Sequence, residues 1–575
     1  MDSKNTTNSA QDFLTAMNTE AHKVMEMFGG KAGEEYLDNL NSAWSQLLNR
    51  PHDPQGWVDA ISEYQKTQMQ FWSGLLTGNT NAATQPAPGD RRFSSDEWSE
   101  SPVFNYIKES YLIASKMLNK LATSANLDEK SQQKLEFYTQ QYIDAMSPTN
   151  FAATNPEVIQ QAIDSKGQSL IDGLQNLIGD IDKGSISMTD EEAFTLGENI
   201  ATTEGSVIFQ NEIMQLIQYK PTTEKVAERP LLIIPPCINK FYILDLQPHN
   251  SFVKHAVEQG NTVFLISWIN ASAEDGHLSW DDYVDKGVFT ALETAKSITG
   301  SDRVNAVAWC VGGTILASAL AVMAARKDNT VSSATFLTTL TDFSEPGDLG
   351  VFIDEEQVGK LVEQVKSEGI LSGKNLSTTF NMLRSNDLIW SYVVNNYLKG
   401  QAPAPFDILY WNSDPTNLPG DMYCYYMTNM YLENNLVKPD ALTICGEKID
   451  LRRIKTPCYM LSCIEDHIAP WESTFAATEL FSNVEFILGA SGHIAGVINP
   501  ASKNRRNFQI DGELGKGTAH WLETSKKVDG SWWNHWTPWL KKRAGKMVKA
   551  TEKLGSKTYS PLEAAPGSFV KKRIN

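Results

Sequence analysis

Three residues with the side chains of a nucleophilic catalytic site each follow a short apolar run in this chain of 575 residues. They are Cys310, Asp466 and His493. If the apolar runs are parallel strands, their carboxyl ends lie along one edge of a sheet, where catalytic groups of such sheets gather. A thiol, a carboxylate and an imidazole in that place predict a nucleophile, an orienting acid and a general base.

The sequence around Cys310 resembles a nucleophile elbow, the sharp strand–turn–helix that α/β-hydrolases encode as G-x-S-x-G. The chain reads Ala308-Trp309-Cys310-Val311-Gly312, with alanine for the first glycine and cysteine for serine. In such a turn the helix N-terminus favours a thiolate, and the Val311 N–H points toward the substrate carbonyl. The alternative is a structural cysteine in an apolar strand, because free cysteine is among the most buried residue types.

The stretch 304–325 carries no charge and could be taken for a membrane-spanning helix, which needs about 20 apolar residues. Gly312 and Gly313 lie in its middle, and each glycine costs a helix about 1 kcal/mol relative to alanine. We therefore predict a buried strand at 304–309 and an alanine-rich helix at 314–325, with no transmembrane span.

The elements around this elbow predict an α/β-hydrolase fold, with a mostly parallel sheet and helices on both faces. Further strands are expected at 230–234 and 262–268, and a helix at 283–298. The acid and the histidine follow predicted strands at 457–464 and 484–488. The chain order of nucleophile, acid and histidine is the order of this fold.

Other residues near the predicted strand ends are candidates for supporting roles. The backbone N–H groups of Val311 and of Cys237 or Ile238 are expected to stabilise an oxyanion. Glu465 competes with Asp466 as the acid, and Asp466 is favoured because it directly precedes the loop. Four residues are candidates for lining the substrate site: His467, Arg384, Ala495 and Phe406.

Two of these four lining candidates have specific interpretations. For His467 the competing interpretation is a structural hydrogen bond. Arg384 could meet a phosphate or carboxylate of a substrate.

Length and composition restrict the class of protein. A chain of this length exceeds a single compact core, so at least two domains are expected. The net charge of −19 argues against a nucleic-acid partner. The six cysteines lack paired spacing, which predicts neither a metal site nor a disulfide framework. The polar N-terminus has no apolar signal core, so a cytoplasmic location is expected.

The domain organisation is predicted from shifts in pattern along the chain. Methionine and aromatic residues at helical spacing predict an α-helical N-terminal domain at 1–190, with a linker at 79–90. A catalytic domain is expected at 191–575. Within it, the aromatic-rich segment 335–435 interrupts the strand–helix alternation and is expected to form a cap that keeps the site dry.

Six segments of the chain closely resemble the polyhydroxyalkanoate synthases of the α/β-hydrolase superfamily. The segments are PPCINKFYILDLQP (235–248), TVFLISW (262–268), AWCVGG (308–313), EDHIAPW (465–471), SGHIAGVINP (491–500) and GSWWNHW (530–536). The resemblance runs from about Arg91 to Trp539 and is weakest in 1–90. The long N-terminal extension resembles the class I enzymes, which make poly-3-hydroxybutyrate. The family's elbow usually begins with glycine, so Ala308 is a departure.

The resemblance implies an acyltransferase that polymerises (R)-3-hydroxyacyl-CoA and releases CoA. Cys310 would carry the acyl group, His493 would be the base, and Asp466 would orient His493 or activate the hydroxyl. It also implies a homodimer on polyhydroxyalkanoate granules in the cytoplasm. No cofactor is expected, because CoA is part of the substrate and a product. The alternatives are a thioesterase or polyester depolymerase on the same fold, and a non-enzymatic granule-coating protein.

Overall fold

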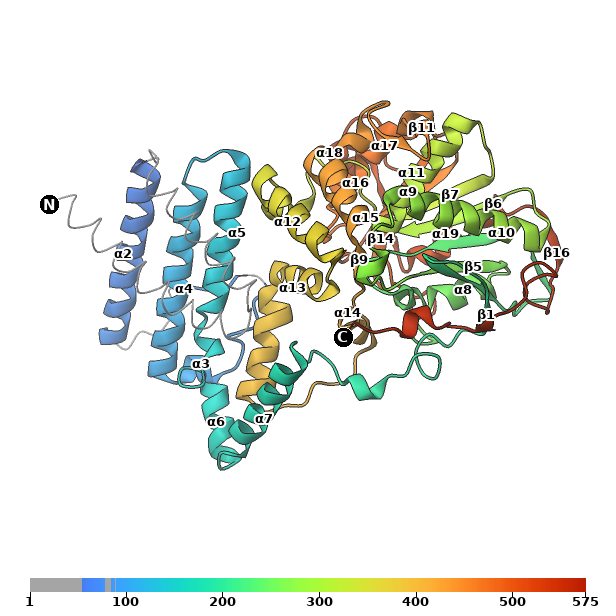
Figure 1. Cartoon of the computed structure of the whole chain (residues 1–575). Coiled ribbons are helices and arrows are strands. Elements are labelled where there is room, and N and C mark those ends of the chain that lie inside the picture. Colours follow the sequence, from blue (N-terminus) through green and yellow to red (C-terminus); the bar gives the residue numbers. More distant parts are fainter. Residues whose placement is uncertain (1–53, 78–83, 88, 575) are drawn as a thin grey trace. The chain divides into compact units, whose positions relative to one another are not determined.

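The structure, a computed structural model, describes residues 54–77, 84–87 and 89–574 (Figure 1). Its contacts group the chain into two compact units. One unit extends to Thr189 and includes Thr378–Ala404, and the other comprises Asp190–Ser377 and the chain from Pro405 onward. The helices predicted before residue 54 lie outside the described residues.

The first unit is built from helices. The longest are α2 (Pro54–Thr77), α4 (Pro102–Thr123) and α5 (Glu129–Ala145). Helix α5 begins at Glu129 because the Asp128 side chain accepts a hydrogen bond from the Ser131 N–H and caps the helix. The shorter helices are α3 (Glu97–Glu100), α6 (Pro156–Asp164) and α7 (Gln168–Lys183).

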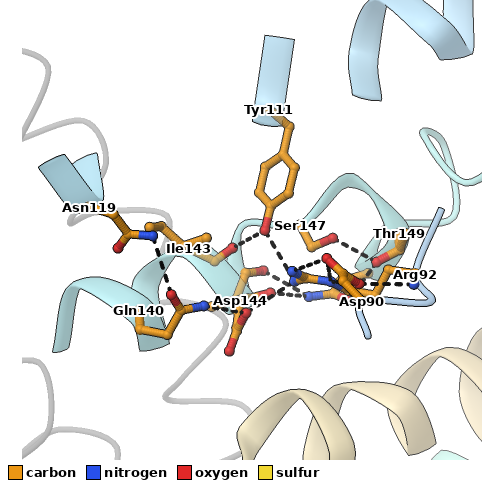
Figure 2. A network of polar contacts seen from close by, with 11 residues as sticks. Asp90, Arg92, Tyr111, Asn119, Gln140, Ile143, Asp144, Ser147 and Thr149 are labelled. Atoms are coloured by element: carbon orange, nitrogen blue, oxygen red, sulfur yellow. Dashed lines mark hydrogen bonds and ion pairs between the residues drawn. The ribbon is translucent and has the colours of Figure 1, made fainter. Parts of the chain in front are cut away.

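A buried polar network ties the start of this unit to α4 and α5 (Figure 2). The Arg92 guanidinium donates hydrogen bonds to Asp90, to the Asp144 carboxylate at 3.1 Å and to the Tyr111 hydroxyl at 3.1 Å. The Tyr111 hydroxyl in turn donates to the Ile143 carbonyl at 2.8 Å. One guanidinium therefore joins three segments that are far apart in the sequence.

Part of the segment predicted as a cap groups with these N-terminal helices. It contains two π-helical stretches, η7 (Asn386–Trp390) and η8 (Val393–Leu398). Gly173 of α7 packs directly against the Tyr397 backbone, where a side chain would collide with the Tyr397 carbonyl. Trp390 and Tyr397 are buried in a cluster with Ala145 of α5.

The second unit contains a sheet of eleven strands within the described residues (Figure 1). Its centre is parallel and consists of β4 (Leu231–Ile234), β5 (Val263–Trp268), β6 (Val304–Trp309), β7 (Val331–Leu337), β12 (Cys458–Cys463) and β13 (Val484–Gly489). The full order is β15-β14-β13-β12-β7-β6-β4-β5-β2-β1-β17. The predicted strands of the sheet are confirmed to within one residue at each end.

The sheet edges run antiparallel, which the sequence did not predict. On one side lie β14 (Asn507–Ile510) and β15 (Lys526–Asp529), and on the other lie β2 (Met214–Tyr219), β1 (Gly205–Gln210) and β17 (Glu563–Ala564). The outermost strands β15 and β17 carry little apolar signal. Strand β15 pairs with the nearby β14, whereas β17 pairs with the distant β1.

Helices cover both faces of the sheet, as the predicted α/β-hydrolase fold requires. Helices α8 (Phe252–Glu258) and α19 (Trp532–Lys541) pack in one core cluster with Tyr459 of β12. Helices α10 (Thr290–Thr299) and α11 (Val311–Arg326) contact β4 and β6 on the opposite face. The helix expected at 283–298 is continuous with α10, but its first part, Tyr283–Phe289, is π-helical.

The elbow helix α11 begins at Val311, so the prediction that it starts after the glycines is wrong. Gly312 and Gly313 lie in its first turn. Glycine is needed at both positions because neighbouring atoms leave no space for a side chain. A methyl group at Gly312 would lie 2.6 Å from the carbonyl oxygens of Ile234 and Pro235, and one at Gly313 would collide with the Thr339 side chain. The helix N-terminus can therefore pack directly on the end of β4.

None of the helices in the described part of the chain combines the length and the apolar character that crossing a membrane requires.

Candidate active site

Cys310 lies in the turn between β6 and α11 with a φ of 52° and a ψ of −127°. Positive φ is uncommon for residues other than glycine, and strain of this kind is concentrated at functional sites. The turn is held because the Cys310 N–H donates to the Leu337 carbonyl at 3.0 Å, and the Gly313 N–H donates to the Cys310 carbonyl at 2.8 Å. The side chain of Cys310 is partly exposed. This is the geometry of a nucleophile elbow.

His493 and Asp466 are brought together by neighbouring strands. Strands β12 and β13 pair in parallel, and Cys463 lies opposite Gly489 at their carboxyl ends. The His493 Nδ1 lies 2.7 Å from the Asp466 Oδ2. Asp466 and His493 are both buried, whereas Glu465 is exposed. Burial and contact therefore distinguish the two acids that the sequence left in competition.

Asp466 is fixed by backbone hydrogen bonds as well as by the histidine. Its Oδ1 accepts hydrogen bonds from the N–H groups of Ile468 and Ala469, both at 2.9 Å. The other oxygen, Oδ2, contacts the His493 imidazole. Both carboxylate oxygens are therefore engaged, and the imidazole is held in one orientation.

The electrostatics of the site link the histidine to the thiol. Burial works against a charged imidazole, but the charge of Asp466 and the neighbouring Cys310 outweigh it and raise the pKa of His493 to about 10. The hydrogen bond between His493 and Asp466 also contributes to this rise. The His493 ring centroid lies 6.2 Å from that of Trp309, the residue before Cys310, so the thiol, the imidazole and the carboxylate lie close together.

The candidate oxyanion donors border the elbow from two sides. Val311 is the first residue of α11. Cys237 and Ile238 lie in the loop that follows β4, and this loop approaches the elbow where the Pro235 carbonyl meets Gly312. Burial raises the pKa of the Cys237 thiol well above its usual range, so this thiol is a poor nucleophile.

The four candidate lining residues lie in different places. His467 is half-buried beside Asp466, and its carbonyl accepts a hydrogen bond from the Asp348 N–H at 3.0 Å. Ala495 is half-buried two residues after His493, and its carbonyl accepts from the Arg506 guanidinium.

The other two lining candidates lie at the surface. Phe406 is 49% exposed at the start of α14 (Asp407–Asn412). Arg384 belongs to the other compact unit, where it pairs with Asp387 at 2.6 Å on the surface. It is therefore not part of the unit that carries the triad.

Two tyrosines near the thiol were not predicted as site residues. Tyr426 and Tyr431 lie on the π-helical stretch η9 (Tyr426–Leu432), and their ring centroids are 5.2 Å apart. Burial raises the pKa of both hydroxyls, and Cys310 raises each further. The sequence shows many aromatic residues in this segment, and no spacing distinguishes these two from the rest.

Within the described residues, no group of three or more His, Cys, Asp or Glu side chains is arranged to hold a metal ion. The chemical groups that the candidate site itself supplies are a thiol, an imidazole and a carboxylate.

The fold and the site define an α/β-hydrolase-fold protein with a cysteine at its nucleophile elbow. A family model described as the alpha/beta hydrolase fold matches residues 230–500. A second model, described as the N-terminus of poly-beta-hydroxybutyrate polymerase (PhaC), matches residues 89–256.

Relatives that match over most of their length identify the family to which the chain belongs within this fold class. The poly(3-hydroxyalkanoate) polymerase subunit PhaC of Cupriavidus necator is 47% identical over 520 residues, which cover 89% of this chain and 88% of the relative. The subunit of the same name from Rhizobium etli is 44% identical over 536 residues, covering 91% and 84%. Poly(3-hydroxyalkanoate) polymerase 1 of Ectopseudomonas oleovorans is 36% identical over 502 residues, covering 87% and 89%. The chain belongs to the poly(3-hydroxyalkanoate) polymerases, which are polymerising acyltransferases.

Proposed function

We propose that the chain polymerises (R)-3-hydroxyacyl-CoA into polyhydroxyalkanoate through an acyl group carried on Cys310. The observation that carries this mechanism is the strained turn at Cys310 next to an imidazole–carboxylate pair, with 2.7 Å between His493 and Asp466. Membership of the polymerase family supports the reaction, and the elbow geometry supports the role of the thiol.

In the first step His493 accepts the proton of Cys310, and the thiolate attacks the thioester carbonyl of the substrate. The tetrahedral oxyanion is stabilised by backbone N–H groups of Val311 and of Cys237 or Ile238. The carbon–sulfur bond to CoA then breaks, and the CoA sulfur takes the proton from His493. One thioester replaces another, so the acyl group remains activated.

In the second step the 3-hydroxyl group of another bound 3-hydroxyacyl unit attacks the carbonyl of the acyl group on Cys310. His493 takes the hydroxyl proton, the ester bond forms and the Cys310 thiol is released. Conversion of a thioester to an oxygen ester is downhill, and this drives chain growth. Both oxygens of Asp466 are engaged by His493 and by backbone N–H groups, which supports a role for Asp466 through His493 rather than at the hydroxyl itself.

The resemblance to class I enzymes extends this proposal. We infer a preference for short 3-hydroxyacyl chains, a homodimer, and attachment to polyhydroxyalkanoate granules in the cytoplasm, with no cofactor beyond the CoA of the substrate.

The test is incubation of the purified chain with (R)-3-hydroxybutyryl-CoA, with CoA release and product identity both measured. Insoluble polyester together with free CoA is the expected result. Free 3-hydroxybutyrate in place of polymer would indicate a thioesterase, and no CoA release would indicate a granule-coating protein. Cys310→Ala serves as the control, because it should release no CoA.

A further inference from the structure

A buried ion pair lies next to the loop that carries two of the candidate oxyanion donors. The Lys240 Nζ is 2.7 Å from the Asp414 Oδ1, and the side chains are only 3% and 1% exposed. Removing two charges from water is costly and can exceed the gain from their attraction, so stability alone does not account for such a pair. Lys240 follows Ile238 by two residues.

Further contacts join the same two segments, which are more than 170 residues apart in the sequence. The Trp411 indole N–H donates to the Lys240 carbonyl at 2.7 Å. The Ile238 carbonyl accepts from both the N–H and the hydroxyl of Thr416, each at 3.0 Å. The Tyr242 hydroxyl donates to the Asp414 Oδ2 at 3.0 Å. The segment 411–416 therefore holds the loop on the C-terminal side of Cys237 and Ile238.

The N-terminal side of the loop is fixed by the elbow and by the neighbouring strand. The Pro235 carbonyl packs against Gly312 at the start of α11. The same carbonyl accepts a hydrogen bond from the Trp268 indole N–H at 2.9 Å. The peptide N–H groups of Cys237 and Ile238 thus lie between two anchored points, one at the elbow and one at the buried ion pair.

A second cation lies near the pair. The Arg573 guanidinium lies over the Tyr410 ring, 5.1 Å from its centroid, and pairs with Glu191 at 3.2 Å. Its charge acts on both Lys240 and Asp414. Loss of Lys240 would leave the Asp414 carboxylate with the Tyr242 hydroxyl and the charge of Arg573, without an ion-pair contact as short as that to Lys240.

We propose that Lys240 and Asp414 are positioning residues that hold the Cys237–Ile238 peptide segment where its N–H groups stabilise the oxyanion formed on Cys310. This proposal rests on the proposed function, because it assigns a role within the acyl-transfer step. The pair acts through the loop and does not contact the reacting atoms.

Two reactions of the same thiol separate this role from a structural one. Acyl transfer from 3-hydroxybutyryl-CoA passes through an oxyanion, whereas alkylation of Cys310 by iodoacetamide is a displacement without an oxyanion. Loss of one oxyanion donor typically lowers the rate about 10²- to 10³-fold. We expect a misplaced loop to lower acyl transfer by about 10²-fold and to leave alkylation within about twofold of the wild type.

The variants are Lys240→Met, Lys240→Arg, and the double variant Lys240→Met/Asp414→Leu. The double variant removes both charges, a change that folded proteins often tolerate without loss of stability. Lys240→Met and the double variant should lower kcat with little change in KM, and Lys240→Arg should recover part of the rate. Lys399→Met is the matched control, because Lys399 forms a 2.6 Å pair with Glu157 in the other unit.

The outcomes are distinct from those that test the proposed function, which depend on the wild-type chain alone. A slower acyl transfer with unchanged alkylation in the folded double variant supports the proposal. A wild-type rate of acyl transfer in the folded double variant would overturn it. A parallel fall of alkylation and acyl transfer would also overturn it, because the pair would then support the whole triad and not the oxyanion site.

Discussion

Asp144 and Asp466 are both buried carboxylates that contact a nitrogen base, one in each compact unit. Asp144 lies 3.1 Å from the Arg92 guanidinium and also accepts from the Gln140 amide at 3.0 Å (Figure 2). Asp466 lies 2.7 Å from the His493 imidazole and accepts from two backbone N–H groups. Burial and hydrogen bonding are therefore similar at the two sites.

The two sites differ in whether the group that contacts the carboxylate can exchange a proton. Burial opposes the charge of Arg92, but Asp90, Tyr111 and Asp144 raise its pKa further, so this guanidinium holds its proton throughout. An imidazole can give up and accept a proton, and the His493 ring lies beside the Cys310 turn, 6.2 Å from the Trp309 ring between centroids. A buried, hydrogen-bonded carboxylate is therefore a candidate for catalysis only where its partner can exchange protons and a nucleophile adjoins that partner.

The largest effect is expected at Asp466, the carboxylate that contacts the histidine. Asp466→Asn removes the charge that orients His493, and a comparable change in a serine protease triad lowers kcat by about 10⁴-fold. Because both oxygens of Asp466 are engaged, first acylation and elongation should fall by similar factors. Rapid-quench measurement of the CoA burst and of the later steady rate compares the two steps. A fall confined to elongation would indicate that Asp466 acts directly on the hydroxyl.

On the structural side, Arg92→Met should lower stability and leave the activity of the folded enzyme unchanged. Removing one partner of a buried pair leaves the Asp144 carboxylate uncompensated, which costs about 3–5 kcal/mol. Urea unfolding followed by tryptophan fluorescence measures this loss. The matched control is Lys116→Met, whose exposed pair with Glu63 contributes less than about 1 kcal/mol. A loss of specific activity in folded Arg92→Met would remove the distinction between the two sites.

The pH dependence of stability sharpens the same comparison with a smaller effect. The pKa of His493 is raised, so the folded protein binds this proton more tightly than the unfolded chain. The resulting stabilisation is complete below about pH 6.5 and is lost as the pH rises toward 10. The stability of the wild type relative to His493→Gln should therefore decline across this range.

Asp144 contributes a pH dependence of stability with the same sign, but in a lower pH range. Burial raises its pKa, and Arg92 opposes this only in part, so the folded state loses relative stability as the pH rises from about 3.8. The comparison with Asp144→Asn should show that decline in acid and a flat difference between pH 7 and 9. A change between pH 7 and 9 at Asp144, or none there at His493, would contradict the assignment of the two networks.

The features that could be predicted from sequence are those with local signals. The apolar run before Cys310, the glycines after it and the order of Asp466 and His493 sufficed to predict the strand, the sharp turn at Cys310 and the proximity of Asp466 to His493. The start of α11 was not predicted because Gly312 is accommodated in the helix by close packing against the carbonyl oxygens of Ile234 and Pro235. No local pattern in the sequence reveals this contact.

The features that could not be predicted depend on contacts between distant segments. The grouping of Thr378–Ala404 with the N-terminal helices depends on packing against α5 and α7. The approach of Tyr426 and Tyr431 to Cys310, and the pairing of Lys240 with Asp414, join residues more than 100 positions apart. Single-sequence patterns carry no information on such pairs.

The most direct test of the acyl-cysteine mechanism is mass spectrometry of the intact chain after mixing with an acyl-CoA that lacks the 3-hydroxyl group. Without that hydroxyl the acyl-enzyme cannot elongate, so it should accumulate. The mechanism predicts one added acyl group, located on the peptide that contains Cys310, present in Cys445→Ala and absent from Cys310→Ala. An acyl group on another residue, or polymer synthesis by Cys310→Ala, would contradict it.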